Sequence, residues 1–340
     1  MMRLPRFQYY TPGEIGEAAQ ILASEGSEAM VIAGGTDLIP NMKRKQQMPK
    51  TLIALRNIAS LRQIKNGSGL NMGAGLTLTD LVQNDKVKAD YTGLWQAAVQ
   101  VATPHLRNMG TLGGNICLDT RCSYYDQNYE WRKAIDYCMK KDGEVCWVST
   151  GSKKCLATSS TDTAPALISL GAKVRLLSAD DDREVLLADL YQDDGIDYLL
   201  RRANEIVSEV ILPDPGNWTS TYWKLRRRGS FDFPVLSVAA AASLAKDGSI
   251  EQARIVLGAV SSRPVVCENV DAFLQGKKLS DEVIEEVSIL CGKAARPVKN
   301  TDFAPAWRKK AIVKIASYAL QDLRGDDMSE QRLKIARHVL

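Results

Sequence analysis

Four of the chain's seven cysteines lie within residues 121–155. They are Cys122, Cys138, Cys146 and Cys155, with the spacing Cys-x15-Cys-x7-Cys-x8-Cys. Sets of four thiolates bind zinc or iron–sulfur clusters. This spacing lacks the close cysteine pairs of zinc ribbons and bacterial ferredoxins, so it indicates a metal site without selecting the metal.

Three simpler explanations of the cysteines compete with an iron–sulfur cluster. Disulfides fit poorly, because seven is an odd count and the N-terminal residues carry no secretory signal. Structural zinc needs the same four thiolates, and the two histidines, His105 and His338, add little. Burial as small apolar side chains is the expectation for Cys117, Cys267 and Cys291.

Two glycine-rich stretches have the composition of phosphate-binding loops. The first, "AGGTDL" (residues 33–38), follows a short apolar run, and the second is "GTLGGN" (residues 110–115). Paired glycines let a phosphate approach backbone N–H groups closely. Neither loop has the spacing of a dinucleotide fingerprint or a phosphate-loop lysine, so we expect backbone amides of both loops to make the contact.

As a pair, "AGGTDL" and "RNMGTLGGN" resemble the FAD-binding subunits of the molybdenum hydroxylase family, which includes xanthine and carbon monoxide dehydrogenases. The resemblance implies that the two loops hold the FAD pyrophosphate noncovalently between two α+β subdomains. It places Asp162 of "TDTAPAL" near the ribityl and phosphate groups, and Lys224 of "YWKLRRRG" near the flavin ring. The full expected FAD site is Ile32, Ala33, Gly34, Gly35, Thr36, Asp37, Leu38, Thr103, Thr111, Gly113, Gly114, Asn115, Asp162, Val207 and Lys224.

Residues between "GGN" and "TDTAPAL" form an insertion relative to ordinary family members. An insertion with four cysteines is similar to that of the beta subunits of 4-hydroxybenzoyl-CoA reductases, which implies a 4Fe-4S cluster on Cys122, Cys138, Cys146 and Cys155. Aromatic side chains are expected to form a small core around the cluster, and lysines to offset its charge. These are Tyr124, Tyr125, Tyr129, Trp131, Tyr137 and Trp147, with Lys140, Lys141, Lys153 and Lys154.

That resemblance further implies partners and a direction of electron flow. The chain would join a molybdopterin-containing large subunit and a 2Fe-2S small subunit in a heterotrimer, dimerised to a hexamer. Reduced ferredoxin would supply electrons for the removal of the phenolic hydroxyl of 4-hydroxybenzoyl-CoA. Alternatives are the flavoprotein subunit of an oxidative xanthine or carbon monoxide dehydrogenase-like enzyme, and a flavin-free scaffold with a zinc-stapled loop.

Bulk composition limits other classes of function. An apolar content of 45% and a net charge of +4 over 340 residues are typical of a soluble globular enzyme. The basic runs at residues 43–45 and 224–228 lack a nucleic-acid fold signature, so nucleic-acid binding is not expected. Solvated faces are the simpler interpretation of both runs, and a local positive field for an anionic cofactor or substrate is the alternative. No apolar run is long enough to cross a bilayer. Because the N-terminal residues also lack a secretory signal, we expect a cytoplasmic protein.

The helices and strands that must position these residues can be predicted from the sequence, and their order indicates an α+β fold. "TPGE" predicts a helix capped by Thr11, with Pro12 in its first turn. Strands and helices should alternate over the first two hundred residues, and a run of strands before helices follows "ILPDPGNW". We expect a two-subdomain FAD-binding domain at residues 1–214, containing an iron–sulfur insert at 117–158. A smaller α+β C-terminal domain at 215–330 and a tail at 331–340 complete the chain.

Overall fold

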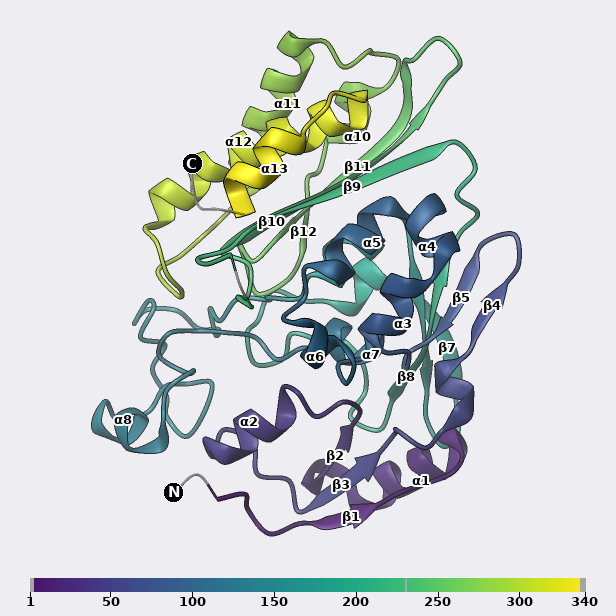
Figure 1. The fold of residues 1–340 in the computed structure, drawn as a ribbon. Helices are drawn as coiled ribbons and strands as arrows, with labels where there is room; N and C mark the ends of the chain where they lie inside the picture. The colour runs from purple at the N-terminus through teal and green to yellow at the C-terminus, as the bar shows by residue number, and fades with distance from the viewer. Residues whose placement is uncertain (1–2, 230, 337–340) are drawn as a thin grey trace.

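The computed structural model describes residues 3–229 and 231–336 and groups their strands into three sheets (Figure 1). The first sheet is parallel, in the order β1-β3-β2. Its strands and the helices between them are β1 (Gln8–Tyr10), α1 (Ile15–Glu25), β2 (Ala29–Ile32), α2 (Leu38–Lys43) and β3 (Thr51–Ala54). The first glycine loop connects the end of β2 to the start of α2.

The start of α1 differs from the expectation. The helix begins at Ile15 with Glu14 as its N-cap, and no cap side chain bonds to its first turn. Instead, the carboxylate of Glu17 accepts a hydrogen bond from the N–H of Gly13 at 3.1 Å. Thr11 and Pro12 therefore precede the helix, and the predicted cap by Thr11 is wrong.

A five-stranded antiparallel sheet forms the second group, in the order β4-β5-β8-β6-β7. Its strands are β4 (Ile64–Asn66), β5 (Leu70–Gly73), β6 (Lys173–Leu177), β7 (Asp182–Leu186) and β8 (Ile206–Leu212). The helices between β5 and β6 are α3 (Leu78–Gln83), α4 (Asp85–Asp90), α5 (Thr92–Val99), α6 (Pro104–Arg107), α7 (Leu112–Ile116), α8 (Tyr129–Ala134) and α9 (Thr163–Ser169). The predicted alternation is wrong here, because this run of helices separates two strands of one sheet.

Residues 117–158 are here called the cysteine segment. The two ends of this segment lie side by side where it meets the second group, and Arg121 and Thr158 form what is here called its neck. Arg121 and Thr158 pair through their backbones, with N–H to oxygen distances of 2.8 and 2.7 Å. Helix α8 is the only helix assigned in this segment of the described structure. In Figure 1 it lies at the left edge of the molecule, on the same side as α2.

The third group is an antiparallel sheet in the order β12-β11-β10-β9, followed by helices. Its elements are β9 (Trp218–Leu225), β10 (Leu236–Leu244), β11 (Ile250–Gly258), β12 (Val265–Val266), α10 (Val270–Leu274), α11 (Asp281–Ala294), α12 (Pro305–Arg324) and α13 (Ser329–Ala336). The predicted run of strands before helices is confirmed. Helix α13 includes the first part of the expected tail, and residues 337–340 lie outside the described residues.

Strand β10 joins the second and third groups because it is buried on both faces. Ala239 and Ala241 belong to the core of the second group, whereas Val238, Ala240 and Ala242 belong to the C-terminal core. Successive side chains of a strand point to opposite faces, so the alanine-rich sequence serves two cores at once. The mixed helix-and-strand fold, with a larger N-terminal part and a smaller C-terminal part, is confirmed.

Candidate functional site

The first glycine loop packs directly on the segment that leads into the second. A Cβ atom added to Gly34 would lie 1.8 Å from the carbonyl oxygen of Met109. Gly35 has a φ of +69°, in the left-handed region that favours glycine. Both glycines are therefore required by the backbone path, and together they bring the two predicted loops side by side.

Backbone donors of the first loop remain open. Among the hydrogen bonds of the described residues, none uses the N–H of Gly34, Gly35 or Thr36. Neighbouring amides are used internally, since the N–H of Ile39 donates to the carbonyl oxygen of Gly35 at 3.1 Å. Consecutive free N–H groups at a glycine turn are the donor set that binds phosphate oxygens. This loop can therefore receive an anionic group on its backbone.

The second loop differs from the expectation that both loops present amides. The N–H of Gly113 donates to Ala74 at 2.8 Å, and the N–H of Gly114 donates to the hydroxyl oxygen of Thr111 at 3.1 Å. Asn115 also donates its N–H to the carbonyl oxygen of Thr111. The Gly113 amide holds α7 against the end of β5, and the Gly114 and Asn115 amides close the first turn of α7. This loop therefore contributes shape and rigidity more than free donors.

Asn115 connects the second loop to the segment that contains Asp162. Its side-chain oxygen accepts hydrogen bonds from the hydroxyls of Thr161 and Thr163, at 2.8 and 2.7 Å, and from the N–H of Thr163 at 3.0 Å. The side chain is buried, so the three bonds fix the start of α9 relative to α7. The structure thus brings together two motifs separated by the cysteine segment in the sequence.

Asp162 and Lys224 meet as a buried ion pair. The Lys224 ammonium donates to the Asp162 carboxylate at 2.9 Å and to the Gln100 carbonyl at 3.0 Å, and the Tyr222 hydroxyl donates to Asp162 at 2.7 Å. Burial raises the pKa of Asp162 and lowers the pKa of Lys224, while their mutual attraction opposes both shifts. The pair joins β9 to the start of α9. The solvated-face interpretation of residues 224–228 is therefore wrong for Lys224.

The remaining predicted FAD residues occupy supporting positions. Thr103 caps α6 by accepting the N–H of Leu106 at 3.3 Å. Val207 is buried on β8 in the core of the second group. Its neighbour Ser208 accepts the N–H of Ala74, whose own carbonyl binds Gly113. Ile32 ends β2, and the stretch from Ala33 leads into α2 at Leu38.

Sequence reasoning missed Arg121, which contacts the first loop from the cysteine segment. Its guanidinium forms an ion pair with Asp37 and hydrogen bonds at 3.3 Å with the side chains of Asn41 and Asp126. It also lies 4.7 Å from the ring centroid of Phe233, in the loop between β9 and β10. The signal available in the sequence was a single arginine beside Cys122.

The four predicted metal ligands line one small pocket. Cys122, Cys138, Cys146 and Cys155 are all buried and free of disulfides. Burial raises the pKa of Cys122 to about 12 and that of Cys155 to about 11, so both thiols are neutral in the metal-free chain. Among the described residues, no group of three or more His, Cys, Asp or Glu side chains is arranged so that it could hold a metal ion.

Lys140 is the charged group of this pocket. It is 6% exposed, and its ammonium donates to Asp119 and Thr120 at 2.8 Å and to the Gly195 carbonyl at 2.6 Å. Its positive charge acts to lower the pKa of Cys155 against the effect of burial. The other lysines with described partners point elsewhere, since Lys141 pairs with Asp142 and Lys154 with Asp193.

The aromatic core around the pocket is smaller than expected. Tyr125 is buried and donates its hydroxyl to Asp119 at 3.1 Å. Trp131 and Trp147 are 38% and 37% exposed. Trp147 nevertheless lines the pocket, whereas Trp131 does not, so the expectation of six enclosing rings is wrong for Trp131 on α8. Cys267 and Cys291 are buried as expected, whereas Cys117 is partly exposed.

Comparison with known proteins decides the family. The profile described as "FAD binding domain in molybdopterin dehydrogenase" matches residues 5–215. The chain belongs to this family. A second profile, "CO dehydrogenase flavoprotein C-terminal domain", matches residues 220–323. The chain is therefore an oxidoreductase subunit of the molybdenum hydroxylase type with an FAD-binding domain.

Individual relatives agree with this assignment. The aldehyde oxidoreductase FAD-binding subunit PaoB of Escherichia coli K12 is 33% identical over 274 residues, covering 78% of this chain and 83% of the relative. The carbon monoxide dehydrogenase medium chain of Hydrogenophaga pseudoflava is 41% identical over 113 residues, covering 33% of this chain and 39% of the relative. The solved carbon monoxide dehydrogenase from that organism gives a TM-score of 0.77 at 24% identity, covering 94% and 97% of the two chains. At that identity the structural match shows the fold.

No helix among the described residues has the length and hydropathy needed to span a membrane. The relatives' names describe medium chains and FAD-binding subunits, which are parts of larger complexes.

Proposed function

We propose that this chain is an FAD and 4Fe-4S electron-transfer subunit of a molybdenum enzyme complex in the cytoplasm. One observation carries the proposal beyond the family assignment. Cys122, Cys138, Cys146 and Cys155, scattered over the cysteine segment, line a single buried pocket. Four thiols around one pocket are the donor set that a 4Fe-4S cluster requires.

The resemblance of the four-cysteine insertion to that of 4-hydroxybenzoyl-CoA reductase beta subunits favours a cluster over zinc. Four thiolates around one pocket would hold a zinc ion as readily as a cluster, so metal and sulfide analysis separates the two. Lys140 supplies a buried positive charge on the pocket wall, which would offset the negative charge of a thiolate-bound cluster. A bound cluster would supply one-electron transfer at a potential set by such charges and by burial.

The glycine loops fit the FAD pyrophosphate. Gly34, Gly35 and Thr36 would donate their open N–H groups to it, while the Thr111–Asn115 loop shapes the opposite wall. Asp162 and Lys224 would act from the buried junction between β9 and α9, where they hold the C-terminal sheet against the FAD-binding domain. Bound FAD would supply the redox chemistry, and the chain would supply binding and orientation. Thr103 and Val207 would support this wall from α6 and β8.

For the complex we propose a 4-hydroxybenzoyl-CoA reductase, with a molybdopterin-containing large subunit and a 2Fe-2S small subunit in a dimerised heterotrimer. Reduced ferredoxin would be the electron donor, and the four-cysteine segment supports this choice. A second candidate is an oxidative complex acting on aldehydes. It is favoured by the 33% identity with the aldehyde oxidoreductase FAD-binding subunit.

Turnover by the purified complex separates the two candidates. The first predicts benzoyl-CoA formation from 4-hydroxybenzoyl-CoA with reduced ferredoxin, and the second predicts aldehyde oxidation with an artificial electron acceptor. In either case Cys138→Ser should abolish the electron transfer that depends on the cluster. Cys117→Ser should leave it unchanged, because Cys117 lies outside the pocket. Full activity in a Cys138→Ser complex would contradict an electron-transfer role of the cysteine segment.

A further inference from the structure

The cysteine segment contacts both ends of α2, the helix that follows the first glycine loop. Arg121 binds Asp37, the N-cap of α2, and Asn41 one turn further along the helix. Beyond its end, Arg132 donates to the carbonyl oxygens of Arg44 and Lys45 at 3.1 and 3.2 Å. Figure 1 shows α8, which contains Arg132, on the same side of the molecule as α2.

Both arginines are nearly inaccessible to water. Their side chains are 8% exposed for Arg121 and 1% for Arg132. Burying a guanidinium is costly unless its N–H groups find partners, so the partners restrict where each side chain can lie. The Nε of Arg121 has no hydrogen-bond partner in the described structure, and neither do the Nε and Nη1 of Arg132, so each arginine depends on the partners of its other nitrogens. For Arg121 these partners are Asp37, Asn41 and Asp126.

Arg121 also stands at the neck of the cysteine segment. Its backbone pairs with Thr158, and the next residue in the chain is Cys122. A movement of Cys122 must therefore act on the backbone of Arg121, and through its side chain on Asp37. Asp37 directly follows Thr36, the last of the three residues with open N–H groups.

We propose that Arg121 is a positioning residue that couples the cysteine segment to the FAD site. Metal loading of the segment fixes Cys122 and Arg121, and Arg121 holds Asp37 so that the open amides keep the arrangement that binds pyrophosphate. Because coupling between two binding sites is reciprocal, FAD binding stabilises the loaded segment in return. This inference rests on the proposed function in that the segment is taken to bind a metal cluster.

The coupling predicts a specific pattern of FAD affinities. The full chain is stripped of FAD, and the FAD dissociation constant is measured by flavin fluorescence for wild type, Arg121→Met, Arg121→Lys and Arg132→Met. Arg121→Met should raise the dissociation constant about fivefold or more, as expected for a typical coupling between sites. Arg121→Lys should restore part of the affinity, since it keeps the charge but not the planar fork.

Arg132→Met is the matched control. It also removes a buried arginine that binds the α2 region, but its contacts lie beyond the far end of the helix from Thr36. A purely structural role would weaken FAD binding equally in both methionine variants. We expect Arg132→Met to lower the thermal unfolding midpoint while changing the FAD dissociation constant much less than Arg121→Met.

A double-mutant cycle with Cys138→Ser tests the coupling itself. Cys138→Ser should weaken FAD binding in the wild-type background and have little further effect in Arg121→Met. An equal effect in both backgrounds, or an Arg121→Met chain that binds FAD as tightly as wild type, would overturn the inference. Iron content distinguishes the two proposals. Wild-type chain without iron contradicts the proposed function, whereas iron-loaded chain with unchanged FAD affinity in Arg121→Met contradicts only the role of Arg121.

Discussion

The first glycine loop and the cysteine segment differ in how their polar groups are arranged. The loop is held by close backbone packing on Met109 and leaves the N–H groups of Gly34, Gly35 and Thr36 open. The segment turns its four cysteines inward, and the charged side chain on its pocket wall, Lys140, is fully bonded. The loop therefore presents unused donors at its surface, whereas the segment keeps its four thiols buried around one pocket.

A variant of Gly34 should have the largest effect, because it should remove FAD without removing iron. In Gly34→Ala the added Cβ would lie 1.8 Å from the Met109 carbonyl oxygen, so the loop must shift and its open amides with it. We expect almost complete loss of FAD with retention of iron, measured as flavin absorbance and metal content of the purified chain. Gly67→Ala is the control, because nothing lies within 4 Å of an added Cβ there. A Gly34→Ala chain with full FAD occupancy would contradict the account of the loop.

Removing the buried charge of Lys140 should have the next largest effect. Lys140→Met leaves the Asp119 carboxylate buried without its partner, which typically costs about 3–5 kcal/mol of unfolding free energy. Chemical denaturation measures this loss, and iron should be lost with it. Adding Asp119→Asn should restore part of the stability. The exposed pair of Lys154 with Asp193 is the control, and Lys154→Met should change stability by about 0–1 kcal/mol.

Thr111→Ala should have the smallest effect of the three. It removes the hydroxyl that accepts the N–H of Gly114, and loss of such a cap costs about 1 kcal/mol. If the second loop mainly provides shape, the variant should still bind FAD at saturating concentration with a modestly lower unfolding midpoint. Loss of FAD as complete as that in Gly34→Ala would show that the two loops share the same role.

Local patterns predicted the parts of the site that depend on short stretches of chain. The glycine pair after an apolar run located the first loop, and the clustered cysteines located the four thiols that share a pocket. The Arg121–Asp37 contact could not be predicted, because its partners are 84 positions apart and no local pattern links them. The same holds for the three threonine contacts of Asn115, which form only when α7 and α9 pack together.

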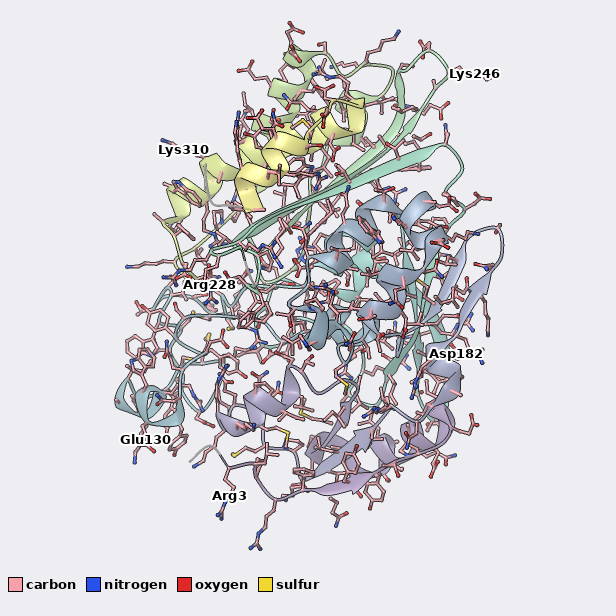
Figure 2. The ribbon with its side chains drawn as sticks, viewed as in Figure 1. Arg3, Glu130, Asp182, Arg228, Lys246 and Lys310 are labelled. Atoms are coloured by element: carbon pink, nitrogen blue, oxygen red, sulfur yellow. The ribbon has the colours of Figure 1, made fainter. Side chains whose placement is uncertain are left out.

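The solvent exposure of aromatic side chains in the cysteine segment could also not be predicted from local sequence patterns. Trp131 and Trp147 have the size of core residues, but their burial depends on where α8 lies relative to the rest of the molecule. Figure 2 shows Glu130, the neighbour of Trp131, at the outer edge of the molecule, and Arg228 of the β9–β10 loop on the same side. Such placement follows from packing between distant segments, which composition does not determine.

The most direct test of the central claim is the metal, sulfide and flavin content of the purified chain, measured for wild type, Cys138→Ser and Cys117→Ser. For wild type we predict about four iron and four sulfide per chain in addition to those of any bound 2Fe-2S subunit, as one 4Fe-4S cluster requires, together with FAD. Cys138→Ser should lose this iron and sulfide while still binding FAD at saturating concentration, and Cys117→Ser should keep all three. Stoichiometric zinc without sulfide, or unchanged iron in Cys138→Ser, would contradict a cluster in the cysteine segment.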